Sequence, residues 1–200
     1  MRVVVVGATG TIGGAVVAAL EEQHEVLGVG NTRGSLRVDI ASSASIEALY
    51  REIGPFDALI STAGRVAYGS LQEVDEEGFR LSLLNKALGQ INLVRLGLEH
   101  IQDGGSFTLT SGVLCREPIV QSVAITPANA AVEGFVRAAA LGLRRCIRIN
   151  AVSPPWLRET LQQMGLDPTP GMPAARVAQA YVESVEGMRN GQVIDARDFG

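Results

Sequence analysis

The sequence predicts an α/β fold in which one doubly wound, mostly parallel sheet of about seven strands carries helices on both faces. Strand and helix signals alternate along the whole chain, beginning with the four consecutive valines of 3–6. The first strand signal leads directly into a glycine-rich turn. No repeat, low-complexity tract or linker interrupts the 200 residues. We therefore expect a single domain over 1–200, with a short substrate segment at 155–173.

Seven short ranges rich in β-branched or apolar residues, with turn-forming residues between them, are expected as strands. They are 3–6, 25–29, 36–38, 57–61, 106–110, 147–152 and 192–194. Helical patterns separate most of these ranges, so the connections are crossovers and neighbouring strands should run parallel.

Apolar residues that recur on one face predict helices between the strands. The expected ranges are 13–22, 43–53, 79–101, 127–143 and 174–187. Ser42 and Ser43 can cap the second helix, and Gly54-Pro55 ends it. Pro127 can start the fourth helix, because the first turn of a helix does not need its missing N–H.

Three glycines follow the first strand at intervals of three residues. Such glycines let the backbone turn sharply and approach a pyrophosphate, while the next helix presents its N-terminal N–H groups. The cofactor contacts expected in this turn are Gly7, Thr9, Gly10, Thr11, Ile12 and Gly13. A tight turn that binds nothing is the alternative.

The residues after the second strand indicate which dinucleotide would bind. Asn31, Thr32 and Arg33 stand where an NAD-dependent enzyme usually has an acid for the ribose hydroxyls. Arg33 instead offers a cation to a 2′-phosphate, which favours NADP(H) over NAD(H). The alternative for Arg33 is an ordinary solvated charge.

Composition excludes several classes of protein. The net charge is −4 and no basic stripe is present, so neither nucleic acid nor an anionic membrane is an expected partner. No apolar run approaches the ~20 residues of a membrane span, and we expect a cytoplasmic protein. Cys115 and Cys146 form no close pair and match no zinc spacing, so no metal site is expected.

A set of motifs at the strand ends points to a family. The segments are Val38-Asp39-Ile40, Thr62-Ala63-Gly64, Phe107 to Ser111, Ala130 to Phe135 and Ile149 to Pro154. Together they resemble the short-chain dehydrogenase/reductases over essentially the whole chain. The resemblance implies a Rossmann-type domain that binds NAD(P)(H), with further contacts from Asp39, Ile40, Ala63, Gly64, Pro154, Trp156 and Leu157.

The chain departs from this family at the catalytic pair. The family uses a tyrosine as proton donor or acceptor and a lysine four residues later. Alignment on Ala130 to Phe135 places Ile125 and Asn129 at those positions, and counting from Ser111 places Ala124 and Ala128 there. Neither alignment supplies a tyrosine or a lysine, although a positioned acid contributes roughly 10²–10⁴-fold to such a reaction.

Five residues are the catalytic candidates. Ser111 matches the family's serine and can polarise a carbonyl oxygen. Lys86 falls where the family has its catalytic asparagine, beside Asn85, which suggests a Lys/Asn exchange with Asn129. Tyr68 follows the fourth strand in a loop that borders the substrate in this family. A solvated lysine, a structural serine and a packing tyrosine are the alternatives.

The segment 155–173 is short for a substrate loop and contains Pro168, Pro170 and Pro173. Pro155 replaces the family's glycine, so the backbone path toward the nicotinamide must change. Trp156 and Leu157 are expected to line the site. A smaller lid implies a more open site or a smaller ligand.

Three functions remain open from the sequence. The first is an NADP-preferring oxidoreductase for a small, unidentified carbonyl or alcohol, with Lys86, Tyr68 or water as the proton source. The second is a catalytically inactive nucleotide-binding protein, such as a redox sensor, and the third is a dimerisation module with a vestigial site. The family resemblance also implies a dimer or tetramer formed through the helices 79–101 and 127–143.

Overall fold

A computed structural model describes residues 1–200 and confirms the predicted architecture. All seven strands form one parallel sheet in the order β3-β2-β1-β4-β5-β6-β7. Their bounds are β1 Arg2–Val6, β2 Glu25–Gly30, β3 Leu36–Arg37, β4 Phe56–Ser61, β5 Ile101–Thr110, β6 Arg148–Ser153 and β7 Val193–Asp195. The order reverses between β1 and β4, which creates a crevice at the carboxyl ends of these strands.

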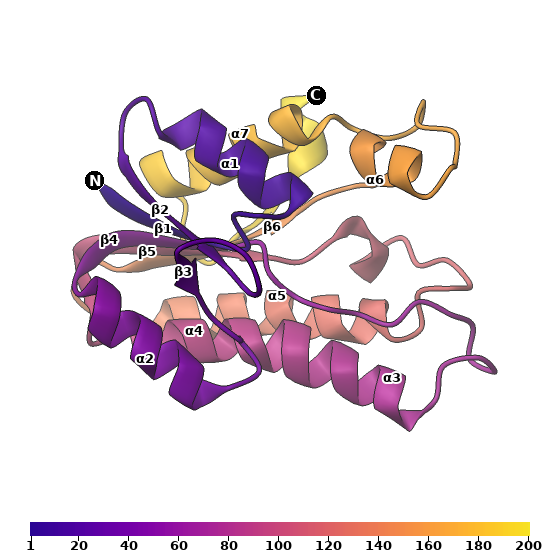
Figure 1. Cartoon of the computed structure of the whole chain (residues 1–200), viewed down its shortest axis with the longest axis horizontal. Helices are drawn as coiled ribbons and strands as arrows, with labels where there is room; N and C mark the ends of the chain where they lie inside the picture. Colours follow the sequence, from indigo (N-terminus) through magenta and orange to yellow (C-terminus); the bar gives the residue numbers. More distant parts are fainter.

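The helices form a layer on each face of the sheet (Figure 1). One layer holds α1 (Thr11–Leu20) and α7 (Ala174–Glu186), and the other holds α2 (Ser43–Ile53), α4 (Gly89–Gly97) and α5 (Ile125–Gly142). Two short 3₁₀ turns follow strands in the sequence: η2 (Val113–Cys115) comes after β5, and η3 (Ala196–Phe199) comes after β7. None of the helices combines the length and apolar composition that crossing a membrane requires.

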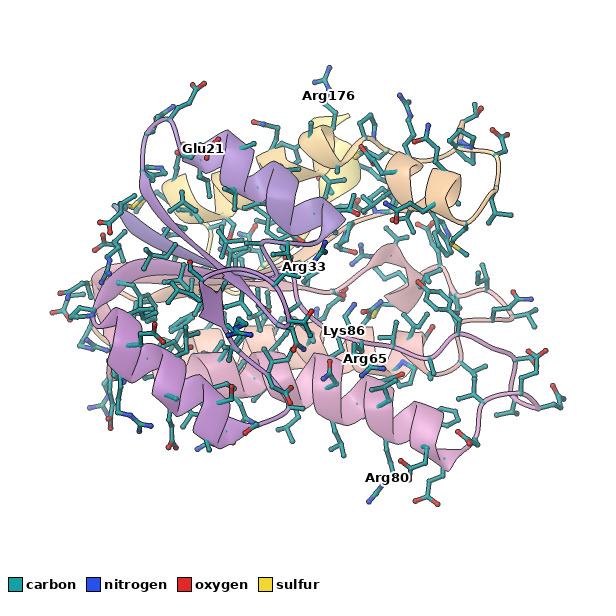
Figure 2. The ribbon with its side chains drawn as sticks, in the orientation of Figure 1. Glu21, Arg33, Arg65, Arg80, Lys86 and Arg176 are labelled. Carbon is teal, nitrogen blue, oxygen red and sulfur yellow. The ribbon has the colours of Figure 1, made fainter.

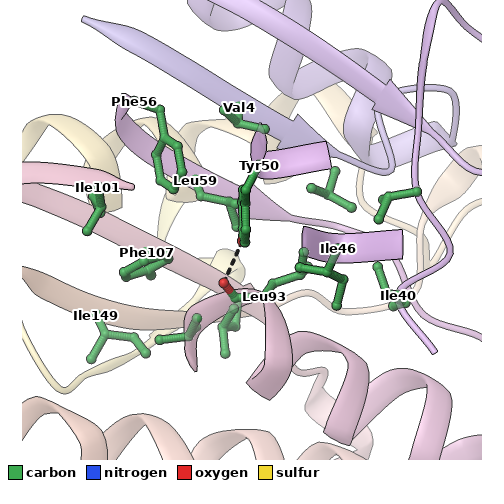
Figure 3. Close-up of a cluster of buried hydrophobic side chains, with 14 of the residues drawn as sticks. Val4, Ile40, Ile46, Tyr50, Phe56, Leu59, Leu93, Ile101, Phe107 and Ile149 are labelled. Carbon is green, nitrogen blue, oxygen red and sulfur yellow. Dashed lines mark hydrogen bonds between the residues drawn. The ribbon is translucent and has the colours of Figure 1, made fainter. Parts of the chain in front are cut away.

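The sheet separates two hydrophobic cores, because alternate side chains of a strand point to opposite faces. In β1, Val4 and Val6 belong to the core under α2, α4 and α5, whereas Val3 and Val5 belong to the core under α1 and α7. Figure 3 shows the first of these cores around Tyr50, whose ring is fully buried and whose hydroxyl donates to the Leu93 carbonyl. Both faces of the sheet are therefore closed, which leaves its carboxyl edge for ligands.

The predicted helix 79–101 is the largest error of the sequence-based boundaries. The structure has α3 (Glu76–Arg80), then a π-helix, η1 (Leu81–Leu88), and then α4, which ends at Gly97. Ile101 already belongs to β5, because the chain reverses through a turn in which His100 N–H donates to the Gly97 carbonyl. The apolar run gave no sign of this turn, since Ile101 fits a helix face and a buried strand equally well.

Smaller differences concern helix starts and the segment 155–173. The helices α1 and α5 each begin two residues earlier than predicted, at Thr11 and Ile125. Pro127 is the third residue of α5, where a missing N–H is still tolerated. The segment after β6 contains a short helix, α6 (Arg158–Gln163). It was not predicted, because prolines lie on both sides of it in the sequence.

Candidate active site and cofactor groove

Two hollows lie at the carboxyl edge of the sheet and share Thr62 and Gly64. The first, here the glycine groove, is lined by Val6, Gly7, Thr9, Gly10, Gly30, Asn31, Val38, Ile40, Thr62, Ala63, Gly64, Arg65 and Asn85. The second, here the central cavity, has a volume of about 330 Å³. Its lining includes Ile12, Val66, Tyr68, Lys86, Ser111, Ile125, Asn129, Trp156 and Leu157. The structure thus brings residues from β1, β4, β5, β6, η1 and α5 together.

The glycine turn is shaped to admit a ligand backbone at the start of α1. Gly7 has φ of +95°, and a Cβ there would lie 2.6 Å from Thr62 Oγ1. A Cβ on Gly13 would overlap the carbonyl oxygen of Gly7. No side chain caps α1, so the N–H groups of its first turn are available to an anion. These features fit a dinucleotide pyrophosphate.

The charges around the glycine groove favour an anionic ligand. Arg65 is the one charged residue that lines the groove, and no carboxylate does. The guanidinium of Arg33 lies at its edge and donates to the Thr9 carbonyl at 3.2 Å. Asp39 does not line the groove, because its carboxylate accepts the Ala41 N–H at 3.0 Å and closes a local turn. The expected contact of Asp39 with the cofactor stays a prediction.

Lys86 reaches into the central cavity from η1. It is the only lysine in a chain with 17 basic residues, and the only charged group that lines this cavity. Its Nζ donates to the Ser111 carbonyl at 3.1 Å and has no carboxylate partner. Burial without a counter-ion lowers the pKa of Lys86 to about 8. In Figure 2, Lys86 lies in the interior of the molecule, whereas Arg80 and Arg176 point outward at opposite edges.

Asn129 and Ile125 line the cavity from α5, one helical turn apart. Asn129 is 1% exposed, and its Oδ1 has no hydrogen-bond partner in the protein. Its Nδ2 lies 3.5 Å from the Gly112 carbonyl, and a Cβ on Gly112 would come within 2.9 Å of this nitrogen. A buried acceptor without a partner is costly, so Oδ1 is available for a ligand that donates a hydrogen bond, such as a ribose hydroxyl.

The hydroxyl of Ser111 is directed at a buried carboxylate. Ser111 Oγ donates to Glu133 Oε1 at 2.8 Å, and Glu133 also pairs with Arg116 at 3.1 Å. Arg116 continues the network to Ser153 Oγ and Asp195, and Arg197 joins Asp195 to Glu117. Ser111 therefore offers its carbonyl, and not a free hydroxyl, to the ammonium of Lys86 in the cavity.

The π-helix η1 holds the loop that follows β4. Ser82 Oγ accepts the Ala67 N–H at 2.9 Å, and Asn85 Oδ1 accepts the Arg65 N–H at 2.8 Å. Asn85 thus supports the glycine groove and does not line the central cavity. The loop places the Tyr68 ring beside the Trp156 ring. Their centroids lie 6.1 Å apart, and the angle between the ring planes is 31°. π-helical turns are frequent at functional sites.

Most of the predicted residues gather around these two hollows. Neither Thr32 nor Arg33 lines a hollow, and Thr11 contributes through the start of α1. Sequence reasoning missed Arg65, Glu133 and Arg116. Arg65 follows Thr62-Ala63-Gly64 directly, so its position was readable, whereas the contact between Glu133 and Arg116 depends on packing between α5 and η2.

Solved structures with the same architecture cover nearly the whole chain. Protein lin1944 from Listeria innocua is 38% identical, with a TM-score of 0.92 and 98% of each chain covered. A small-chain dehydrogenase crystallised in complex with NADPH is 28% identical, with a TM-score of 0.85 and coverage of 98% of this chain and 95% of that one.

Sequence comparisons agree with these structures. Hydroxynaphthalene reductase arp2 of Aspergillus fumigatus is 25% identical over 150 residues, which are 72% of this chain and 55% of that reductase. This chain spans little more than half the length of that curated relative. Residues 2–188 match the family described as enoyl-(acyl carrier protein) reductase. With this match over most of its length, the chain belongs to the short-chain dehydrogenase/reductase family.

Proposed function

We propose that this oxidoreductase transfers hydride between NADP(H) and a small carbonyl or alcohol compound, with Lys86 as the proton donor in the reduction. Members of its family use NAD(P)(H), and its relatives are named reductases and dehydrogenases. The observation that carries the proposal is the position of Lys86. Its ammonium faces the central cavity beside the glycine groove, with no carboxylate partner and with protons left to donate.

The residues of the two hollows divide the work of holding a dinucleotide. The first turn of α1 would bind the pyrophosphate, and Arg33 and Arg65 would bind phosphate charge. Asn129 Oδ1 would accept a hydrogen bond from the nicotinamide ribose. When bound, the reduced nicotinamide supplies the hydride that adds to the carbonyl carbon.

Lys86 supplies the proton that the developing alkoxide needs. A general acid works best when its pKa lies near the operating pH, and the pKa of Lys86 is about 8. Its positive charge also polarises the carbonyl before hydride arrives, which is the role that the family gives to a serine hydroxyl. Lys86 Nζ loses one proton per reduction and regains it from water at the open side of the cavity.

Cofactor titration followed by turnover tests this function. We expect saturable binding of NADPH and NADP⁺, and NADPH oxidation when a panel of small aldehydes and ketones is added. Binding without any turnover would support the nucleotide-binding protein instead of the enzyme. No binding of NADPH, NADP⁺, NADH or NAD⁺ would exclude both and leave only the dimerisation module.

Replacement of Ser111 by Ala should lower kcat less than about tenfold. The reason is that its hydroxyl is engaged by Glu133, while the carbonyl that orients Lys86 is retained. Steady-state kinetics with saturating NADPH measure the effect. A loss of about 10²-fold or more in a variant with unchanged thermal stability would restore Ser111 to a catalytic role.

Replacement of Arg33 by Ala and replacement of Arg65 by Ala should have different effects on the affinity for the cofactor. Arg33→Ala should weaken NADPH about tenfold or more and leave NADH unchanged, because a 2′-phosphate is present only in NADPH. Arg65→Ala should weaken both cofactors, since Arg65 lines the groove that also contains Gly7 and Gly10. Calorimetric titrations compare them, with Arg80→Ala as an exposed control paired only with Glu76 and Glu77. Equal NADPH affinity in all three variants would contradict both assignments.

The self-association implied by the family stays a prediction. Leu84 and Leu88 of η1 are 49% and 43% exposed, and Leu141 of α5 is 90% exposed. These apolar side chains lie on the two helical segments proposed as the contact. The mass of the protein in solution distinguishes a dimer or tetramer from a monomer.

A further inference from the structure

The central cavity has an aromatic wall and a single charge, which together restrict its ligand. Tyr68 and Trp156 come from the loops after β4 and β6, which the sequence separates by nearly ninety positions. Both side chains line the cavity, and Tyr68 is 55% exposed. No hydrogen bond holds the Tyr68 hydroxyl, and the Tyr68 ring lies beside that of Trp156.

The separation of the two rings determines how a third ring can bind. A flat ring held between two others needs two spacings of about 3.5 Å, or roughly 7 Å in total. The centroids of Tyr68 and Trp156 lie 6.1 Å apart, so no flat ligand fits between them. A ligand must lie against the wall that the pair presents to the cavity, where the offset stacking that aromatic rings prefer is available.

The volume of the cavity shows that a ring can enter it. A cavity of about 150 Å³ holds one benzene molecule. The central cavity, at about 330 Å³, is open to water on one side, so it admits a ring of this size, and the rest of a larger ligand can extend outside.

The lining also limits the charge of the ligand. Lys86 is its only charged residue, and no aspartate or glutamate is present to receive a cation. The remaining polar side chains that line it are amide and hydroxyl groups, among them Asn129 and Thr160. A cationic ligand would meet the like charge of Lys86 in an apolar setting, whereas an anionic ligand would be attracted.

We infer that the substrate is a planar, conjugated carbonyl compound, either uncharged or anionic, with a ring that packs against Trp156 and Tyr68 while its carbonyl oxygen faces Lys86. This inference rests on the proposed reduction. The hydride adds to the carbonyl carbon and the reduced nicotinamide is oxidised. The electron pair of the C=O bond takes a proton from Lys86, so that an alcohol leaves and Lys86 regains its proton from water.

A matched pair of ketones tests planarity. Acetophenone and cyclohexyl methyl ketone have similar size and the same reacting group, but only the first has a flat, conjugated ring. Calorimetric titration in the presence of NADP⁺, where no reduction occurs, should give about tenfold tighter binding of acetophenone. Because Trp156 is the only tryptophan, its fluorescence should be quenched saturably by acetophenone at the same concentrations. Equal or tighter binding of the cyclohexyl ketone would overturn the inference.

Two charged derivatives of acetophenone test the restriction on the charge of the ligand. We expect 4-acetylbenzoate to bind at least as tightly as acetophenone, and the 4-acetyl-N,N,N-trimethylanilinium ion to bind at least tenfold more weakly. In the Lys86→Met variant this difference between anion and cation should disappear. Tight binding of the cationic ketone to the unmodified protein would contradict the inference.

Variants of Trp156 connect the preference to the wall. Trp156→Leu should reduce the acetophenone preference about tenfold, measured as the ratio of kcat/KM for the two ketones, and Trp156→Phe should restore most of it. Comparison of this ratio between the wild type and the variants cancels the different intrinsic reactivities of the ketones. An unchanged ratio in Trp156→Leu would contradict the role of the wall.

The same titrations separate the two proposals. If NADPH binds and the cyclohexyl ketone is preferred, the substrate class is wrong while the oxidoreductase stands. If no dinucleotide binds and no ketone is reduced, the proposed function fails. Titration of the two ketones without NADP⁺ then still decides whether the wall selects flat rings.

Discussion

The Lys86→Met variant should lose carbonyl reduction by roughly 10²–10⁴-fold while it still binds NADPH. Methionine fills a similar volume but has no proton to donate, whereas the glycine turn, Arg33 and Arg65 stay in place. Turnover and calorimetric titration measured on one preparation separate the two effects. Lys86→Arg is the matched control, because it keeps the charge but holds its proton too tightly to act as an acid near neutral pH. Unchanged kcat in Lys86→Met would exclude Lys86 as the proton donor.

The pH dependence of the wild-type enzyme should report the same group. Reduction needs protonated Lys86, so its rate should fall as the pH rises through about 8, and alcohol oxidation should rise over the same range. Protein labelled with ¹³C at the ε carbon of lysine gives one lysine signal, since the chain has one lysine. Its NMR titration should therefore give the pKa of Lys86 directly. A midpoint near the ordinary value of 10.5 would remove the basis for this profile.

The Lys86→Met substitution should also raise the free energy of unfolding. Lys86 carries a buried charge without a counter-ion, which is unfavourable until the group loses its proton. Because burial lowers the folded-state pKa to about 8 from 10.5, the unfolded chain binds more protons between these values. Wild-type stability should therefore rise with pH across this window. The melting temperature of Lys86→Met should exceed that of the wild type most clearly below pH 8, and the gap should close above 10.5.

The Gly13→Ala variant should lose about 10²-fold or more in NADPH affinity. A Cβ at Gly13 overlaps the Gly7 carbonyl oxygen, so the turn that cradles the pyrophosphate must move. The same clash should lower thermal stability, as overpacking usually does by about 1–3 kcal/mol. Calorimetric titration and thermal melting of one preparation measure both effects.

Gly14→Ala provides the matched control for this change. It makes the same substitution one residue later in α1, but its Cβ would lie 3.7 Å from the Ala8 carbonyl oxygen, an ordinary contact. We expect NADPH affinity close to that of the wild type and a small gain in stability, since Ala favours a helix over Gly. Equal affinity in the two variants would show that the geometry of the turn does not control cofactor binding.

The sequence predicted the fold well because its signals are local and repeated. The valines of β1, the glycines after it and the Ser42 cap of α2 each act through near neighbours, and the structure has all three features. The motifs at the strand ends predicted the central cavity for a related reason. The carboxyl ends of parallel strands meet at one edge, so the residues after β1, β4, β5 and β6 converge there.

The sequence could not predict side-chain contacts between distant segments. The hydroxyl of Ser111 donates to Glu133, which lies 22 positions later on another element, and the sequence gave no sign of this partner. The position of Lys86 was identified by counting residues, whereas its lack of a counter-ion could be seen only after folding.

The direction in which Lys86 points depends on the number of residues in the π-helix η1 as well as on their identity. Consecutive residues of a helix are rotated by roughly a quarter of a turn, so the loss of one residue within 81–85 would turn Lys86 by about that angle relative to the residues before it. A single deletion there would therefore move the ammonium away from the central cavity without any substitution at position 86.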